Sequence, residues 1–172
     1  MAGIYSANSG LPLTVVESTS AWGGSQQVGS ISAGAIPINK MNFGNGVNAN
    51  VAGSNGVGTS GDPARGGSGL NLFSDPETAF NDFRPVLLSI DGRNGRDLVR
   101  GLSHWNIDLS IGKKTRITER MLGVFTFDMI NALNHVEFVD PALSLQSRAN
   151  FGVLNTQYGT PRAIQLGLRI EF

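Results

Sequence analysis

The 172-residue sequence contains no cysteine. Without cysteine the chain can have neither a disulfide framework nor a thiolate metal site. The absence fits the periplasm or the outer membrane, where unpaired thiols would be oxidised. An excess of one charge is lacking too, since thirteen basic residues balance thirteen acidic ones. There is no basic run and no acidic tail, so the chain offers no electrostatic basis for binding nucleic acid.

Long apolar runs are also missing. No run reaches the roughly 18 residues that a membrane-spanning helix requires. This excludes helical spans but not β-strands, which cross a membrane with about ten residues of alternating character. A signal peptide is lacking as well, because Met1–Tyr5 has neither a basic head nor an apolar stretch. An outer-membrane protein must be exported, so on that interpretation we expect the chain to lack its natural N-terminus.

No catalytic constellation is evident. The glycine-rich region lacks the phosphate-loop motifs, and there is no Gly-x-Ser-x-Gly elbow. His104 and His135 have no metal-ligand spacing to another ligand, and His135 is interpreted as a polar turn residue. Asp108 and Asp128 could face each other as an acid pair, but lining a polar barrel interior is the favoured role. We therefore expect no enzyme activity, no cofactor and no metal.

What the sequence does contain is apolar alternation of period two, which predicts extended strands with one apolar and one polar face. The pattern is clearest at the end of the chain, where apolar side chains stand at Ile164, Leu166, Leu168, Ile170 and Phe172. Four segments carry it, at residues 3–16, 104–111, 120–130 and 162–172, the first most weakly. We predict an all-β fold, an antiparallel meander of about four strands.

Charged residues indicate which face of each strand meets the apolar phase. On a lipid-facing surface a mid-depth charge costs about 2–4 kcal/mol, most for Arg or Lys. The residues expected to face lipid are Trp105, Ile107, Leu109, Phe125, Phe127, Ile164, Leu166 and Leu168. Those expected to face a lumen are Asp108, Asp128 and Arg169. Alternation alone would favour an ordinary soluble sheet, because half-buried antiparallel sheets show the same pattern.

The lengths of the connections favour a membrane barrel instead. A short polar segment, Gly112–Glu119, joins the second and third strands, whereas residues 17–103 and 131–161 form long connections. Outer-membrane barrels have short periplasmic turns and longer extracellular loops. If Phe172 lies at the periplasmic side, both long connections fall outside. Within the first, Gly44–Gly69 is so rich in Gly, Asn and Ser that we expect a mobile segment without packed structure.

The pattern at Gln165, Gly167, Ile170 and Phe172 resembles the closing strand of a bacterial outer-membrane barrel, where such residues form the signal for the assembly machinery. The order and spacing of further segments resemble the C-terminal end of the Oar-like TonB-dependent receptors. Two residues depart from that pattern, Leu102 in place of a proline and Met129 in place of an aromatic. The matching segments are Ser9–Val15, Leu72–Phe80, Asp91–Gly101, Trp105–Lys113, Ile117–Arg120, Phe125–His135, Phe138, Phe151–Gly152 and Gly159–Leu166.

The resemblance implies a barrel of about 22 strands with a plugged lumen, in the outer membrane of a Gram-negative cell. Four strands are fewer than the roughly eight of the smallest membrane barrels, so we expect this chain to be the C-terminal segment of such a receptor. The intact parent would take up a large nutrient, with TonB contacted through its missing N-terminal part. Outer-membrane lipid and the barrel assembly machinery are the other expected partners. The alternatives are a soluble secreted all-β binding or adhesion domain, and a small barrel assembled from several four-stranded chains.

Overall fold

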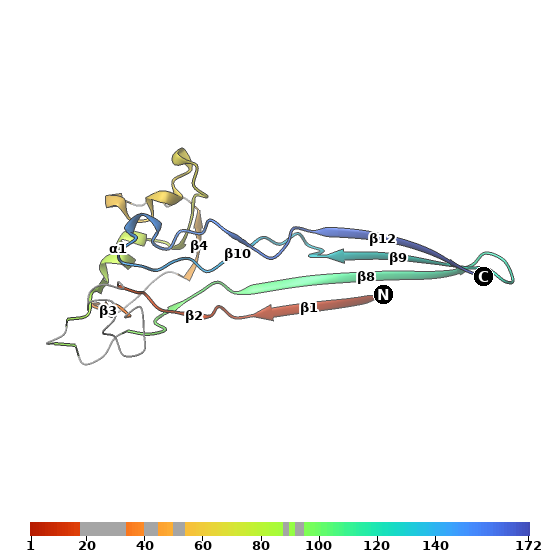
Figure 1. Ribbon diagram of the computed structural model, residues 1–172, viewed down its shortest axis with the longest axis horizontal. Coiled ribbons are helices and arrows are strands. Elements are labelled where there is room, and N and C mark those ends of the chain that lie inside the picture. Colours follow the sequence, from red (N-terminus) through yellow and green to blue (C-terminus); the bar gives the residue numbers. More distant parts are fainter. Residues whose placement is uncertain (18–33, 40–44, 50–53, 88–89, 92–94) are drawn as a thin grey trace, which may run out of the picture. The chain divides into compact units, whose positions relative to one another are not determined.

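The computed structural model describes residues 1–17, 34–39, 45–49, 54–87, 90–91 and 95–172 (Figure 1). These residues divide into two compact units. The first, here called the sheet unit, consists of Met1–Ser9, Ser103–Glu137 and Gln157–Phe172. The second, here called the loop unit, consists of Gly10–Leu102 and Phe138–Thr156. Within the described residues, no helix is long and apolar enough to span a membrane.

The sheet unit is a four-stranded antiparallel sheet in the order β1-β8-β9-β12 (Figure 1). Its strands are β1 (Ala2–Asn8), β8 (His104–Arg116), β9 (Leu122–Ile130) and β12 (Ala163–Glu171). The order in space follows the order in the chain, so the strands form a meander. The predicted all-β antiparallel meander of four strands is therefore confirmed.

Two predicted strand ends differ from the structure. β8 continues to Arg116, although Gly112–Glu119 was expected to be a turn. The apolar alternation stops after Ile111, but β9 still offers a backbone partner, and pairing continues to the contact of Arg116 with Leu122. The turn shrinks to residues 117–121, where Ile117 N–H donates to the Met121 carbonyl at 2.9 Å. The first expected strand, residues 3–16, is also different, because β1 ends at Asn8.

The loop unit is built from short elements. Its strands are β2 (Pro12–Leu13), β3 (Ile36–Pro37), β4 (Asn45–Ala49), β5 (Leu70–Phe73), β6 (Phe83–Arg84) and β7 (Val99–Arg100), paired as β2–β7, β3–β6 and β4–β5. Its helices are α1 (Pro76–Asn81) and the 3₁₀ turns η1 (Ser54–Gly56), η2 (Thr59–Gly61), η3 (Pro63–Arg65) and η4 (Arg148–Asn150). The chain carries two more short strands, β10 (Glu137–Phe138) and β11 (Gln157–Tyr158), where it passes between the units.

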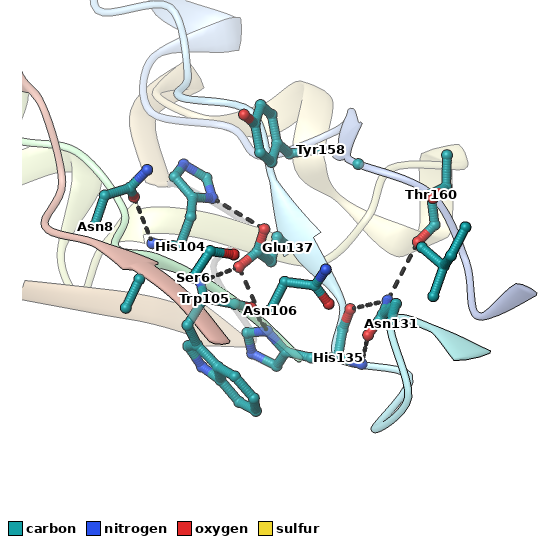
Figure 2. A pocket seen from close by; sticks show the side chains of 13 residues that line it. Ser6, Asn8, His104, Trp105, Asn106, Asn131, His135, Glu137, Tyr158 and Thr160 are labelled. Atoms are coloured by element: carbon teal, nitrogen blue, oxygen red, sulfur yellow. Dashed lines mark hydrogen bonds and ion pairs between the residues drawn. The ribbon is translucent and has the colours of Figure 1, made fainter. Parts of the chain in front are cut away.

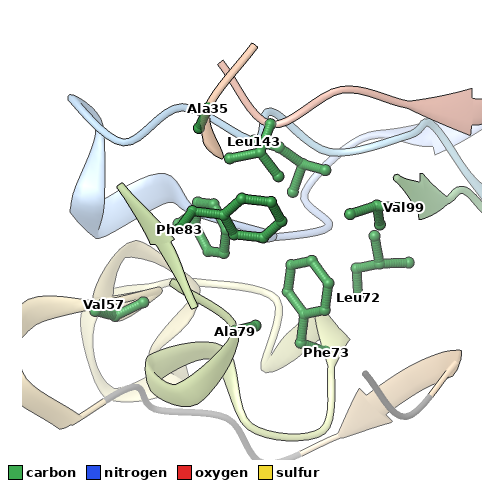
Figure 3. Close-up of a cluster of buried hydrophobic side chains, with 10 residues drawn as sticks. Ala35, Val57, Leu72, Phe73, Ala79, Phe83, Val99 and Leu143 are labelled. Atoms are coloured by element: carbon green, nitrogen blue, oxygen red, sulfur yellow. The ribbon is translucent and has the colours of Figure 1, made fainter. Parts of the chain in front are cut away.

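A hydrophobic core holds the loop unit together (Figure 3). Phe151 lies at its centre, fully buried, with its ring stacked on Phe73 at 5.4 Å and edge-on to Phe80 at 5.1 Å. Such aromatic pairs contribute about 0.5–1.5 kcal/mol beyond the area they bury. The other buried members are Val15, Ala35, Val57, Leu72, Ala79, Phe83, Val99 and Leu143.

This core corrects the expectation that Gly44–Gly69 has no packed structure. Val57, inside that segment, is fully buried, and residues 54–65 form three 3₁₀ turns. Composition missed this because the segment need not bury its own apolar surface. It shares one core with residues from distant parts of the chain, such as Phe151, and Gly58 N–H donates to the Arg148 carbonyl at 2.9 Å. Residue 44 and residues 50–53 lie outside the described part of the chain.

Candidate functional site

The strand register places one row of apolar side chains across the sheet. Directly paired residues share a face, and Phe127 pairs with both Ile111 and Leu166. On either side of this row, Met129 pairs with Leu109 and Ile164, and Phe125 pairs with Leu168. All eight residues predicted to face lipid lie on this face: Trp105, Ile107, Leu109, Phe125, Phe127, Ile164, Leu166 and Leu168.

This apolar face is open. Leu166 is 65 % exposed and Leu168 is 75 % exposed, although both sit within β12. Ile164, Ile170 and Phe125 are exposed as well. A contiguous exposed apolar surface on a soluble monomer is unusual and marks a face that meets another apolar phase.

The opposite face is polar and holds the three residues predicted to line a lumen. Asp128 accepts a hydrogen bond from the hydroxyl of Ser110, its direct partner on β8. Asp108 accepts from the Asn106 amide at 2.8 Å and from the Asn131 backbone N–H at 2.9 Å. Arg169 makes an ion pair with Glu171. Because Asp128 pairs with Ser110, the two aspartates are not directly opposite each other, and each accepts hydrogen bonds from other groups.

Gly167 has a local structural role. It lies directly opposite Thr126, and a Cβ at this position would collide with the Thr126 hydroxyl. Glycine therefore leaves room for a cross-strand polar side chain on the polar face. This requirement is independent of any role in assembly, which stays a prediction for Gln165, Gly167, Ile170 and Phe172.

A cavity of about 310 Å³ lies where β8 begins and β9 ends (Figure 2). Glu137 is its only carboxylate, and two histidines face it. The Nδ1 atoms of His104 and His135 lie 3.4 and 3.5 Å from the two Glu137 oxygens, and the Trp105 backbone N–H also donates to this carboxylate. The His135 ring stacks on the Trp105 indole, with centroids 4.0 Å apart. His135 is thus a cavity residue and not merely a turn residue, which corrects the interpretation from sequence.

Asn131 fixes the turn that leads into this cavity. It is almost fully buried and has a left-handed backbone, with φ of 50°. Its amide donates to the carbonyls of His135 (2.9 Å) and Thr160 (3.2 Å), and its oxygen accepts from the His135 N–H at 2.8 Å. Asparagine tolerates this conformation better than most residues. The Asn131–His135 segment is therefore a turn fixed by hydrogen bonds, and the bond to Thr160 connects it to the residues that precede β12.

Sequence reasoning did not bring the two histidines together. They are separated by 31 positions, whereas their common partner Glu137 lies only two residues after His135. The spacing of His135 and Glu137 is local, but it carries no signal that His104 joins them. The described part of the chain holds no group of three or more histidine, cysteine or acidic residues arranged to bind a metal ion.

In the loop unit, motifs from distant parts of the chain meet. The Gly10 and Gly101 backbones approach so closely that a Cβ on Gly10 would overlap the Gly101 carbonyl. Gly101 N–H donates to the Leu11 carbonyl at 2.8 Å. Gly152, with φ of 72°, leaves no room for a Cβ beside Asn71. These contacts give a packing reason for the Ser-Gly, Arg-Gly and Phe-Gly motifs of the sequence.

An ion pair closes the segment after β6. Arg84 donates hydrogen bonds from both terminal nitrogens to the Asp91 carboxylate, at 2.6 and 2.7 Å, and the Leu87 backbone N–H donates to the same carboxylate at 2.7 Å. The hydrogen bond with Arg84, aided by that of Leu87, lowers the pKa of Asp91 to about 2. At the start of α1, hydrogen bonds from the Thr78 hydroxyl and backbone N–H lower the pKa of the capping residue Asp75.

Comparison with known proteins shows which family of β-proteins the chain resembles. The family model for the outer membrane beta barrel domain matches residues 1–165, nearly the whole chain. No curated protein and no solved structure gives a match.

Proposed function

Because the chain belongs to the outer membrane beta barrel domain family, we propose that it forms part of the wall of a TonB-dependent receptor of the Oar-like kind. The chain is an outer-membrane β-barrel protein. In this proposal β1, β8, β9 and β12 are neighbouring strands in the wall of a larger barrel, which lies in the outer membrane of a Gram-negative cell. The intact receptor takes up a large nutrient, coupled to energy through TonB.

The open apolar face is the observation that carries the membrane assignment. A soluble sheet covers such a face with a second layer, whereas a barrel turns it toward lipid. On the proposed orientation Trp105, Phe127 and Leu166 contact lipid, while Asp108, Asp128 and Arg169 line the water-filled side. The hydrogen bonds and ion pair of those three residues suit a wet, polar lumen.

The edges of the sheet support membership of a larger barrel. Within the described residues, β1 and β12 each have one edge without a partner strand. Lipid does not tolerate unpaired backbone groups, and a closed membrane barrel needs at least about eight strands. Further strands must therefore pair with both edges. Along β12, Gln165, Gly167, Ile170 and Phe172 would present the pattern that the barrel assembly machinery recognises.

The receptor assignment rests on sequence resemblance and on the connections. The turn at residues 117–121 is short, while the opposite strand ends lead into the segments of the loop unit. This asymmetry is typical of outer-membrane barrels, whose long loops are extracellular. We propose no enzymatic activity and no cofactor for the chain. TonB would contact the receptor outside the barrel strands.

Two experiments in the native host test the proposal. Deletion of Phe172 from the chromosomal gene should strongly reduce the protein in the outer-membrane fraction, whereas Glu171→Gln, a neighbouring change, should not. Unchanged amounts after the deletion would contradict the assembly role. For transport, strains lacking either this gene or TonB should share a growth defect on at least one nutrient of a panel. A growth defect in the strain that lacks this gene, with normal growth of the strain that lacks TonB on the same nutrient, would refute energy coupling.

A further inference from the structure

The cavity beside Glu137 has the chemistry of a binding site for a small ligand. Its volume of about 310 Å³ falls within the range of small-molecule pockets. The polar side chains around it come from β1, β8, the corner after β9, β10 and β11 (Figure 2). Neither Lys nor Arg lines it, and Glu137 is the sole acidic residue among the lining side chains. An anionic ligand such as a phosphate would therefore be repelled.

A cationic ligand is not required either. The Glu137 carboxylate already accepts a hydrogen bond from the Trp105 backbone N–H. The Nδ1 atoms of both histidines lie within 3.5 Å of its oxygens. The hydrogen bond from the Trp105 N–H offsets part of the negative charge without a bound cation. The carboxylate nevertheless keeps lone pairs that can accept further hydrogen bonds, as from hydroxyl groups.

Asn106 supplies an acceptor without a partner. Its Nδ2 donates to Asp108 at 2.8 Å, which fixes the orientation of the amide because a carboxylate can only accept here. The other end of the amide, Oδ1, is buried and has no hydrogen-bond partner among the described residues. A buried acceptor left without a donor costs free energy. A donor that reached this oxygen would remove that cost, and Asn106 is among the residues that line the cavity.

Tyr158 supplies an aromatic surface beside these polar groups. Its ring lies 4.4 Å from that of His104, and the side chain remains half exposed. An exposed aromatic ring can pack against an apolar C–H face of a ligand while its hydroxyl stays in water. Uncharged donors and acceptors of Ser6 and Asn8 complete the rim.

We propose that this cavity binds a neutral polyhydroxylated ring, that is, one sugar residue. Only such a ligand combines several hydroxyl donors for Asn106 and Glu137 with a C–H face for Tyr158 and carries no charge. The proposal is independent of TonB coupling and of the lipid contact of the opposite face. Binding can therefore be measured without transport, and its failure would leave the membrane assignment intact.

Saturation-transfer NMR of the intact receptor, purified from the outer membrane of the native host, tests the site. The receptor would be kept in a zwitterionic detergent, because maltoside and glucoside detergents carry competing sugars. The probes are the methyl glycosides of glucose, galactose and mannose, with choline as a cationic probe. Variants Tyr158→Leu and Asn106→Ala remove the aromatic surface and the amide. Tyr5→Leu is the matched control, since Tyr5 is an exposed tyrosine of the same sheet unit and lies outside the cavity.

We expect at least one glycoside to bind saturably, with affinity reduced about tenfold by each cavity variant and unchanged by Tyr5→Leu, as for the loss of about one favourable contact. Far-UV circular dichroism checks that each variant folds. If Asn106→Ala does not fold, Tyr158→Leu alone decides the test. Three results would overturn the proposal: no saturable binding of any glycoside, equal binding by Tyr158→Leu, or binding of choline in place of the sugars.

Discussion

Replacement of Leu166 by arginine gives the sharpest contrast between a lipid-facing and a water-facing sheet. Leu166 lies in the middle part of β12, pairs with Phe127 and is 65 % exposed. If the apolar face meets lipid, arginine at this depth should lower the free energy of unfolding by about 2–4 kcal/mol. That corresponds to roughly thirtyfold or more in the folding equilibrium. If the face met water, an exposed substitution should change stability by less than about 0.5 kcal/mol.

The neighbouring residue provides the control. Gln165 is exposed too, but it pairs with Asp128 on the polar face, so Gln165→Arg adds the same charge beside a carboxylate. Urea unfolding of the two variants, each made in the intact receptor and reconstituted in phospholipid vesicles, would measure the difference by tryptophan fluorescence. We expect Leu166→Arg to unfold at clearly lower urea and Gln165→Arg to behave like the parent. Equal stability of the two variants would refute the assignment of the faces.

Three further predictions concern stability. Arg84 holds the pKa of Asp91 at about 2, below its ordinary value of 3.8, so the stability contribution of this carboxylate is complete above about pH 4 and is lost as the pH falls toward 2. The urea midpoint of the loop unit should fall over that range, and the fall should be smaller in Asp91→Asn; an equal fall would contradict the role of the ion pair. Phe151→Ala should destabilise the loop unit by about 3–5 kcal/mol and expose it to limited proteolysis, whereas the exposed Leu11→Ala should not. Asn131→Ala should be less stable in thermal unfolding than Asn131→Gly by about 1–2 kcal/mol, because only glycine accepts the left-handed backbone without strain; the reverse order would show that the backbone conformation is not limiting.

The sheet could be predicted from sequence because its information is local. Alternation from Ile164 onward marks β12 and its two faces, since neighbouring side chains of a strand point in opposite directions. The end of β8 could not be predicted in this way. Residues 112–116 lack apolar alternation, and they are extended because β9 pairs with them.

The loop unit and the cavity depend on contacts that are distant in sequence. Val57 is buried by residues from other parts of the chain, so the composition of its own segment gave the wrong expectation. Likewise, His104 joins His135 and Glu137 from a distant position, and no spacing in the sequence links it to them. Asn131 is an intermediate case, because an asparagine-rich segment after a strand indicates a turn but not its partners.

The central claim, that one face of the sheet meets lipid and the other meets water, is tested most directly by spin labels along β12. The chain has no cysteine, so it adds no labelling background to single-cysteine variants at positions 164, 165, 166, 168 and 169. In membranes, labels at 164, 166 and 168 should be accessible to oxygen, which concentrates in lipid, and labels at 165 and 169 to a water-soluble nickel reagent. Accessibility to the nickel reagent at every position, or the opposite alternation, would contradict the account.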